Sequence, residues 1–357
     1  MIRVHVLTER PTNQNTAAFL APLVWNAPLL RNSGIAVRLF YGDEPALTEC
    51  DVVAVNSKLW KGDWGPHKDR ALALLDRLRS RRRLLYFDRS STPGLINADV
   101  FPYVDRYLKN AVYRDRSHYL RPVYGARLFA EHYRNTGVTD ATAPFTPQAL
   151  RPEDTARIEV AWNTGLANYS LLGPRLGSLY GSIPVRQLFA PPRRFTPPST
   201  YRPIAVSCRM GVRYRYETVG HQRKRMATLL AAHRRTERVS KFAYGRELRQ
   251  SRIAASPFGY SEINYKDFEV FLAGGVLLKP DMSHLETWPN YYVAGTTYVA
   301  HRWDLADVET QIETILARPD LAMTIAHAGQ DAYRHQVRDE AGRAAFAARF
   351  ASIVGTA

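Results

Sequence analysis

Cysteine and long apolar runs are both scarce in this chain. Only two cysteines, Cys50 and Cys208, occur among its 357 residues, and they lie in different halves. We therefore expect small buried thiols in a reducing compartment and no disulfide framework. No apolar run reaches the roughly 18 residues that a membrane-spanning helix needs. With no signal-peptide cleavage pattern at the start, the sequence predicts a cytoplasmic protein.

Several catalytic signatures are missing as well. The sequence contains no GxxxxGK[ST], HExxH or GxSxG pattern and no paired cysteines. A G-x-G-x-x-G fingerprint is also absent, which argues against an enzyme that uses a dinucleotide. His118 and His132 lack the spacing of metal ligands, so no metal site and no resident cofactor are predicted.

Basic charge is concentrated in one part of the chain. The net charge is +16, and the segment from Arg186 to Arg252 holds 17 Lys and Arg residues against 3 acids. Such a block has three ordinary causes, which are phosphate ligands, nucleic acid and an anionic membrane surface. A solvated arginine-rich face without any ligand is an equally good explanation.

The first half alternates between strand-like and helix-like segments, which predicts a parallel sheet covered on both faces. The expected strands are Ile2–Leu7, Ile35–Tyr41, Asp51–Val55, Leu84–Phe87 and Ile158–Trp162, and the expected helices are Ala17–Leu30 and His67–Arg79. The Tyr- and Arg-rich segment Val104–Tyr133 is expected at the C-terminal edge of this sheet, where open α/β folds bind ligands.

The pattern restarts after a proline-rich stretch. Five prolines between Ala190 and Pro203 exclude a helix or a central strand and predict a linker. The expected strands beyond it are Ile204–Cys208, Ile253–Ala255, Val276–Leu278 and Tyr298–Ala300, and the expected helices are Gly220–His233, Tyr265–Ala273, Val308–Ala317 and Leu321–Phe350. Two α/β units joined in this way leave a cleft between them.

The segment Ser256–Tyr292 is the strongest candidate for a ligand site. A carboxylate such as Glu269 can make two hydrogen bonds to the vicinal diol of a ribose. The amides of Tyr265, Lys266 and Asp267, at the start of the predicted helix, could bind a diphosphate. An acid in the first turns of a helix is also common without any ligand, so the structural explanation stays open.

Other charged residues follow predicted strands. Arg209 comes directly after Ile204–Cys208 and is a candidate phosphate ligand, with Lys241 as a weaker one. Asp88 ends a buried strand and is a candidate catalytic base, although a capping role is as plausible. Lys109, Arg114 and Arg116 are candidates for an anionic acceptor or for the donor phosphates across the cleft.

The sequence SPFGYSEINYKDFEVFLAGGVLLKPDMSHLETWPNYY resembles the donor-binding segment of bacterial glycosyltransferases of the GT-B fold. The similarity is greatest to surface-polysaccharide enzymes and to the exostosin-like and spore-protein-CgeB-like groups. It implies that Glu269 binds the donor ribose and that Gly259, Tyr260 and Ser261 lie near the diphosphate or sugar. Retaining members carry two glutamates separated by seven residues. Glu262 and Glu269 are separated by six, so Glu262 stays an open candidate for binding the donor sugar, and retention versus inversion stays open.

The resemblance also implies an arrangement of domains. Residues 1–189 would form an acceptor-binding Rossmann-like domain, 190–203 the linker, and 204–338 the nucleotide-sugar-binding domain, with a helix in 339–357 returning to the first domain. The expected function is metal-independent glycosyl transfer from a nucleotide sugar to a glycan or lipid-linked glycan, in surface-polysaccharide synthesis. The expected location is the cytoplasm or, peripherally, the inner membrane face. A nucleotide-sugar epimerase, a polyol-phosphate transferase and a basic nucleic-acid-binding protein are the alternatives.

Overall fold

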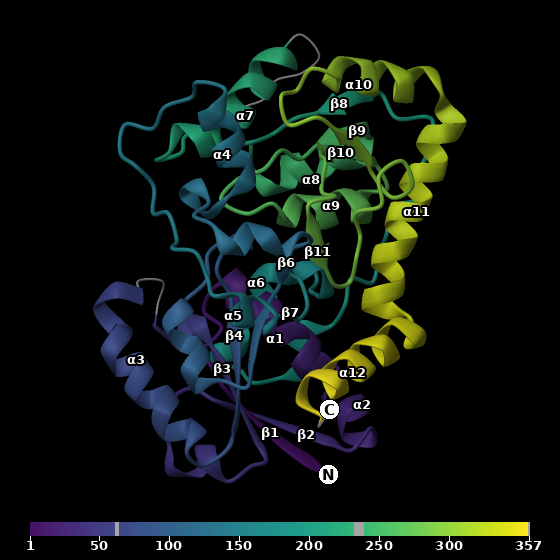
Figure 1. The fold of residues 1–357 in the computed structure, drawn as a ribbon. Helices are drawn as coiled ribbons and strands as arrows, with labels where there is room; N and C mark the ends of the chain where they lie inside the picture. Colours follow the sequence, from purple (N-terminus) through teal and green to yellow (C-terminus); the bar gives the residue numbers. More distant parts are fainter. Residues whose placement is uncertain (61–63, 232–238, 356–357) are drawn as a thin grey trace.

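The computed structural model describes residues 1–60, 64–231 and 239–355, and these form two parallel α/β sheets (Figure 1). All strand pairs of the first sheet are parallel, in the order β2-β1-β3-β4-β5-β7. The chain order reverses at β1, so β1 and β3 leave a switch point at their C-terminal ends. The strands are β1 (Ile2–Leu7), β2 (Ile35–Phe40), β3 (Val52–Asn56), β4 (Arg83–Asp88), β5 (Arg106–Lys109) and β7 (Ile158–Val160).

Helices lie on both sides of the first sheet, with α3 on one side and α1, α2 and α12 on the other (Figure 1). The side chain of Asn13 caps α1 by accepting a hydrogen bond from the Thr16 amide at 3.0 Å. The bounds are α1 (Gln14–Trp25), α2 (Ala27–Asn32), α3 (Trp64–Arg79), α4 (Leu128–Asn135), α5 (Pro152–Thr155), α6 (Gly173–Ser178) and α12 (Glu340–Val354).

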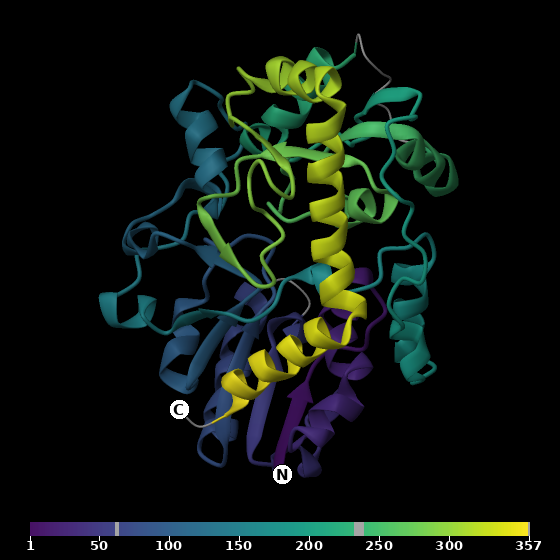
Figure 2. The ribbon, with the colours of Figure 1, turned by 90° about the vertical axis from the view of Figure 1, so that its right-hand side faces the viewer.

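The second sheet is smaller and also parallel, in the order β12-β10-β9-β8. Its strands are β8 (Ile204–Ser207), β9 (Ser251–Ala255), β10 (Val276–Pro280) and β12 (Val299–His301). The helices of this half are α7 (Glu217–Leu229), α8 (Lys241–Gln250), α9 (Tyr265–Ala273), α10 (Val308–Ala317) and α11 (Pro319–Arg338). Figure 2 shows α11 descending from the second sheet and α12 crossing the first.

An antiparallel ribbon joins the two halves. β6 (Ala111–Tyr113) comes from the first half and pairs with β11 (Leu285–Thr287) from the second. The backbone amide of Arg114 extends the pairing by donating to the His284 carbonyl at 2.9 Å. The domains therefore share backbone hydrogen bonds in addition to side-chain contacts.

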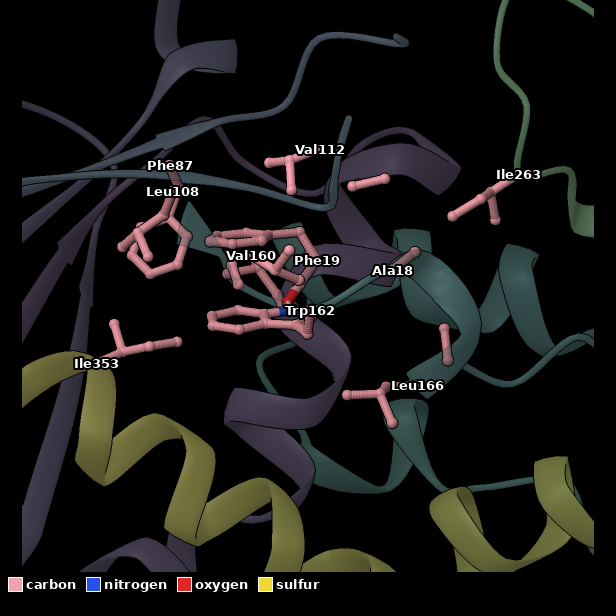
Figure 3. Close-up of a cluster of buried hydrophobic side chains, with 14 of the residues drawn as sticks. Ala18, Phe19, Phe87, Leu108, Val112, Val160, Trp162, Leu166, Ile263 and Ile353 are labelled. Atoms are coloured by element: carbon pink, nitrogen blue, oxygen red, sulfur yellow. Dashed lines mark hydrogen bonds between the residues drawn. The ribbon is translucent and has the colours of Figure 1, made fainter. Parts of the chain in front are cut away.

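A buried aromatic cluster under the first sheet shows how α12 is held (Figure 3). Trp162 is fully buried and stacks on Phe19 with a centroid distance of 5.2 Å. Phe346 and Phe350 of α12 meet the same indole edge-on at 5.6 and 6.0 Å. Burying aromatic side chains of this size contributes several kcal/mol, so α12 is part of the core of the first domain.

The parallel α/β class predicted from the sequence is confirmed, and several elements differ in detail. The segment Val104–Tyr133 contributes the strand β5, which was not expected, between β4 and β7, and residues 110–133 follow the C-terminal end of that strand. The helix expected over Ala17–Leu30 is two helices that meet at Asn26. The helix expected over Leu321–Phe350 begins at Pro319 and is interrupted at Asp339, while α8 had no counterpart in the sequence reading.

Candidate functional site

Helix α9 positions the central carboxylates of the site. It begins after Asn264, whose amide donates to the Asp267 carboxylate at 3.1 Å in a capping box. It ends at Gly274, where the backbone adopts a left-handed φ of 68°. A Cβ at Gly274 would lie 2.3 Å from the Thr196 carbonyl oxygen, so only glycine fits against the linker.

Asp267 and Lys279 form a fully buried ion pair behind this helix, with 3.1 Å between Nζ and Oδ2. The Ser256 hydroxyl donates to the same carboxylate at 2.5 Å and the Tyr292 hydroxyl at 2.7 Å. Every oxygen of Asp267 is therefore used inside the protein. The pair fixes the segments before and after α9 and β10, and it has no capacity left for a ligand.

A cavity of about 570 Å³ opens on the other side of α9. This volume suits a nucleotide-sized ligand. Linker residues and the segment after Ala167 form one wall, while α8 and α9 form the other. The polar and charged side chains that line it include Tyr169, Lys241, Tyr244, Arg246, Arg249 and Glu269.

Glu269 is a partly buried carboxylate that makes no hydrogen bond or ion pair within the described residues. Burial raises its pKa, and the nearby charges of Lys241 and Lys266 only partly oppose that effect. The Tyr244 hydroxyl, also in the cavity wall, is buried and has no hydrogen-bond partner in the described part of the chain. Two such groups on one cavity wall are unusual, because buried polar groups are normally satisfied.

Arg209 and Lys266 lie near this cavity but are engaged within the protein. Arg209 forms a salt bridge with Glu247 at 2.9 Å and has a side chain only 13 % exposed. The Lys266 ammonium donates to the carbonyls of Arg209 and Ala255, and burial lowers its pKa to about 8. Both residues hold the ends of β8 and β9 together in this state.

Asp88 and Lys109 form a second buried ion pair, at 2.7 Å, where β4 and β5 end. The Tyr107 hydroxyl and the Ser90 amide also donate to Asp88, at 2.7 and 2.8 Å. Burial opposes ionisation of Asp88, but Lys109 and these donors outweigh it and hold the pKa below its ordinary value. A base role would require this network to open, and Lys109 cannot reach an acceptor from its buried position.

Arg114 and Arg116 belong to the interdomain ribbon. Arg114 donates to the carbonyls of Ser283 and Leu285 at 3.0 and 3.1 Å. Arg116 pairs with Glu286 at 2.7 Å. These contacts hold β6 against β11, so in this structure the two arginines do not share a surface with Lys109.

Residues Gly259 to Glu262 are not among those that line the cavity. Glu262 is 1 % exposed, and it accepts a long hydrogen bond, 3.5 Å, from the Thr92 hydroxyl. Burial raises its pKa to about 7, although Arg127 opposes the shift. The Tyr260 carbonyl accepts a hydrogen bond from Arg127 at 3.0 Å, so the loop is held against the first domain.

The predicted site residues thus fall into separate places. Glu269 and Lys241 share the cavity, and Tyr265 reaches across the domain seam, where its hydroxyl donates to Asn15. The sequence reading missed Tyr169 and Tyr244 in the cavity wall, as well as Arg89 at the seam. Arg89 directly follows Asp88 at the end of a buried strand, a signal that could have identified it.

A second cavity of about 640 Å³ lies at the C-terminal ends of β1, β2 and β3. Aromatic side chains of Tyr41 and Trp60 line it, with His67 and Arg70 contributed by α3. This is the switch point of the first sheet, where open α/β folds bind ligands.

Much of the basic block has structural partners. Arg202 donates to the carbonyls of Ser251 and Ala273 at 3.0 and 2.6 Å, and Arg223 donates to the Pro257 carbonyl at 3.2 Å. Part of the block, 232–238, lies outside the described residues.

Within the described ranges, no cluster of three or more His, Cys, Asp or Glu side chains could hold a metal ion. No helix described there is long and apolar enough to cross a membrane.

No family model matches the sequence, and no curated protein matches it. Many solved structures are similar to this chain, and three examples cover nearly all of it. HepE from Anabaena in complex with UDP has a TM-score of 0.46 at 11 % identity and covers 99 % of both chains. An alpha-glucosyltransferase in complex with UDP and DNA has a TM-score of 0.47 at 8 % identity and covers 100 % of both. A glycosyltransferase from Rickettsia africae has a TM-score of 0.42 at 10 % identity, covering 100 % of this chain and 99 % of that one.

Proposed function

We propose that this protein is a glycosyltransferase that takes its sugar from a nucleotide-sugar donor. The observation that carries the proposal is the Glu269 carboxylate, which lies in a nucleotide-sized cavity without a hydrogen-bond partner among the described residues. A ribose diol would satisfy both of its oxygens. The unpartnered Tyr244 hydroxyl in the same wall supports a polar ligand there.

The cationic side chains of the cavity suit a diphosphate leaving group. Lys241, Arg246 and Arg249 line it, and preorganised cations stabilise charge that develops as the sugar leaves. We propose that this stabilisation proceeds without a bound metal, an expectation that activity in excess EDTA would check. Arg209 would take part only after releasing Glu247.

The acceptor side is proposed to be the first domain, at the switch-point cavity lined by Tyr41 and Trp60. Aromatic faces of this kind pack against the apolar faces of sugar rings, which favours a glycan or lipid-linked glycan. Synthesis of a surface polysaccharide, and docking of the basic residues on anionic lipid, are parts of the proposal that rest on the sequence resemblance and on charge.

A nucleotide screen with a matched pair of variants tests the proposal. We expect UDP, GDP, ADP, dTDP or CMP to raise the melting temperature of the wild-type protein. Glu269→Ala should abolish that shift and lower sugar transfer at least 100-fold, with an unchanged unfolding temperature. Glu309→Ala, an exposed acid on α10, is the control and should behave as wild type. Near wild-type turnover in Glu269→Ala would overturn the assignment.

The alternatives predict different products. An epimerase would convert a nucleotide sugar without any acceptor, and a polyol-phosphate transferase would release a nucleoside monophosphate. A nucleic-acid-binding protein would bind DNA or RNA with a steep salt dependence and would not respond to Glu269→Ala.

A further inference from the structure

Arg89 carries a charge that the protein itself leaves without an acceptor. It follows β4 and is partly buried at the seam between the two domains. Its backbone amide donates to the Ser57 hydroxyl at 2.8 Å, but its guanidinium makes no hydrogen bond or ion pair to any described residue. Arginine stays protonated in proteins, so the charge cannot be removed by loss of a proton.

The groups around the guanidinium are already occupied. The neighbouring Asp88 carboxylate is used by Lys109, Tyr107 and the Ser90 amide. Arg89 interacts with the Tyr265 and Tyr169 hydroxyls only through charge, and both hydroxyls donate elsewhere. The Phe19 ring, 5.0 Å from the guanidinium carbon, is its only close aromatic support among the described residues.

Burying a charge without a partner is unfavourable, because no hydrogen bond or ion pair compensates for the loss of its hydration. Burial lowers the pKa of Arg89, which expresses the same cost. The cation–π contact with Phe19 offsets only part of that cost. A ligand anion at this place would compensate for more of the desolvation cost, since a guanidinium binds phosphate oxygens in a bidentate manner.

The location indicates which anion. Tyr265, which faces Arg89, is the first residue of α9, and the start of a helix attracts negative charge. Tyr169 packs on Tyr265 at 5.0 Å and also forms part of the Glu269 cavity wall. Arg89 therefore lies beside the N-terminal end of the helix whose second turn presents Glu269.

We propose that Arg89 is the cation with which the first domain binds the diphosphate of the donor, opposite Glu269 of the second domain. This rests on the proposed function, because Glu269 must bind the nucleoside for the diphosphate to extend toward α9. Each domain then supplies one half of the donor site, and binding of the diphosphate links the domains.

The test separates the two halves of the ligand. Affinities for UDP, GDP and ADP and for uridine, guanosine and adenosine are measured with wild type, Arg89→Met, Arg89→Lys and Arg82→Met. Arg82 is exposed, so its variant removes the same charge away from the seam. Arg89→Met should weaken binding of the preferred diphosphate about 10- to 100-fold and leave nucleoside affinity unchanged. Arg89→Lys should recover part of the loss, and Arg82→Met should match wild type.

Inorganic pyrophosphate keeps this test independent of the nucleoside half. It should stabilise wild type and Arg82→Met against heat, and Arg89→Met much less. If no nucleotide or nucleoside binds, the proposed function fails while the pyrophosphate result still decides the role of Arg89. Equal diphosphate and pyrophosphate binding by Arg89→Met and wild type would overturn the inference. So would equal losses of nucleoside and diphosphate affinity, or a lower unfolding temperature of Arg89→Met without any ligand effect.

Discussion

Each domain contains a buried aspartate–lysine pair, and each pair has an unpaired charge close to it in the sequence. Asp88 and Lys109 close the end of the first sheet, and Arg89 follows directly. Asp267 and Lys279 form the pair of the second half, and Glu269 lies two positions after Asp267 on α9, in the cavity lining. The paired groups are saturated with protein contacts, while the neighbouring charges have no acceptor or donor among the described residues. A charged side chain whose hydrogen-bonding atoms are all used by protein groups has a structural role. A charged side chain without such partners is available to a ligand.

The largest effect should come from breaking a saturated pair. Lys279→Met leaves the Asp267 carboxylate buried without its counter-ion, and we expect a loss of about 3–5 kcal/mol in the free energy of unfolding. Chemical denaturation measures it, and Lys109→Met should cost a similar amount in the other domain. If both variants lost less than about 1 kcal/mol of unfolding free energy, the buried ion pairs would not have the structural role assigned to them.

Glu262 sharpens the comparison because it is buried without a close partner. Its pKa of about 7 in the folded state exceeds the ordinary 4.5, so the native protein holds a proton that the unfolded chain releases between these pH values. Stability therefore falls as pH rises through this window, by roughly 3 kcal/mol for this group. Glu262→Gln stays neutral and should be more stable than wild type at pH 8 but not at pH 4.5.

Denaturation at several pH values gives the difference between Glu262→Gln and wild type. Comparing the two proteins cancels other titrations, such as that of His284, whose pKa burial lowers to about 4. His284 acts in the opposite sense, because its contribution is lost as pH falls from about 6.5. A difference that does not depend on pH would show that Glu262 ionises normally.

A smaller effect on binding, with almost none on stability, is expected for Glu269→Gln. The amide keeps the size of the side chain but loses one acceptor, so nucleotide affinity should fall about tenfold or more. Unfolding free energy should stay within about 0.5 kcal/mol of wild type or rise, since a partly desolvated charge is removed. Calorimetry with the best nucleotide, together with denaturation, checks both. A large loss of stability would place Glu269 with the structural charges.

The smallest effect is expected at the contact between the two domains, where Tyr265 lies close to both Arg89 and Glu269. Tyr265→Phe removes the hydrogen bond from the Tyr265 hydroxyl to Asn15 and should cost about 1 kcal/mol. Tyr124→Phe, which loses a hydrogen bond to Asp140 within the first half, is a matched control for the loss of one hydroxyl. A pronounced drop in nucleotide binding by Tyr265→Phe alone would show that the seam also orders the donor site.

Local signals explain what the sequence could predict. The bounds of α9 matched the expectation Tyr265–Ala273 because its limits are set by adjacent residues, Asn264 and Gly274. Strand β5 was missed because its sequence, RYLK, resembles a polar surface segment. Lys109 is buried there only because Asp88 compensates it from 21 positions earlier. Pairings of this kind depend on the register of strands, which composition does not reveal.

In the candidate site, too, local features could be predicted from the sequence and long-range pairings could not. Glu269 was identified from its place on a helix, whereas the saturation of Arg209 by Glu247 depends on how α8 packs against β8. Whether a charge is free is a property of its neighbours in space. Arg89 illustrates this point, since the sequence places it after a strand but cannot show that Asp88 is already occupied.

The packing of α12 on Trp162 has a consequence for how the chain acquires its structure. Arg349 donates to the Ala161 carbonyl, 188 positions earlier in the chain, at 3.4 Å, and Phe346 and Phe350 cover the Trp162 indole. During synthesis, the first domain must wait for all of the second domain before its apolar surface is covered. Contacts so distant along the chain slow folding, so the first domain should depend on chaperones until α12 emerges from the ribosome.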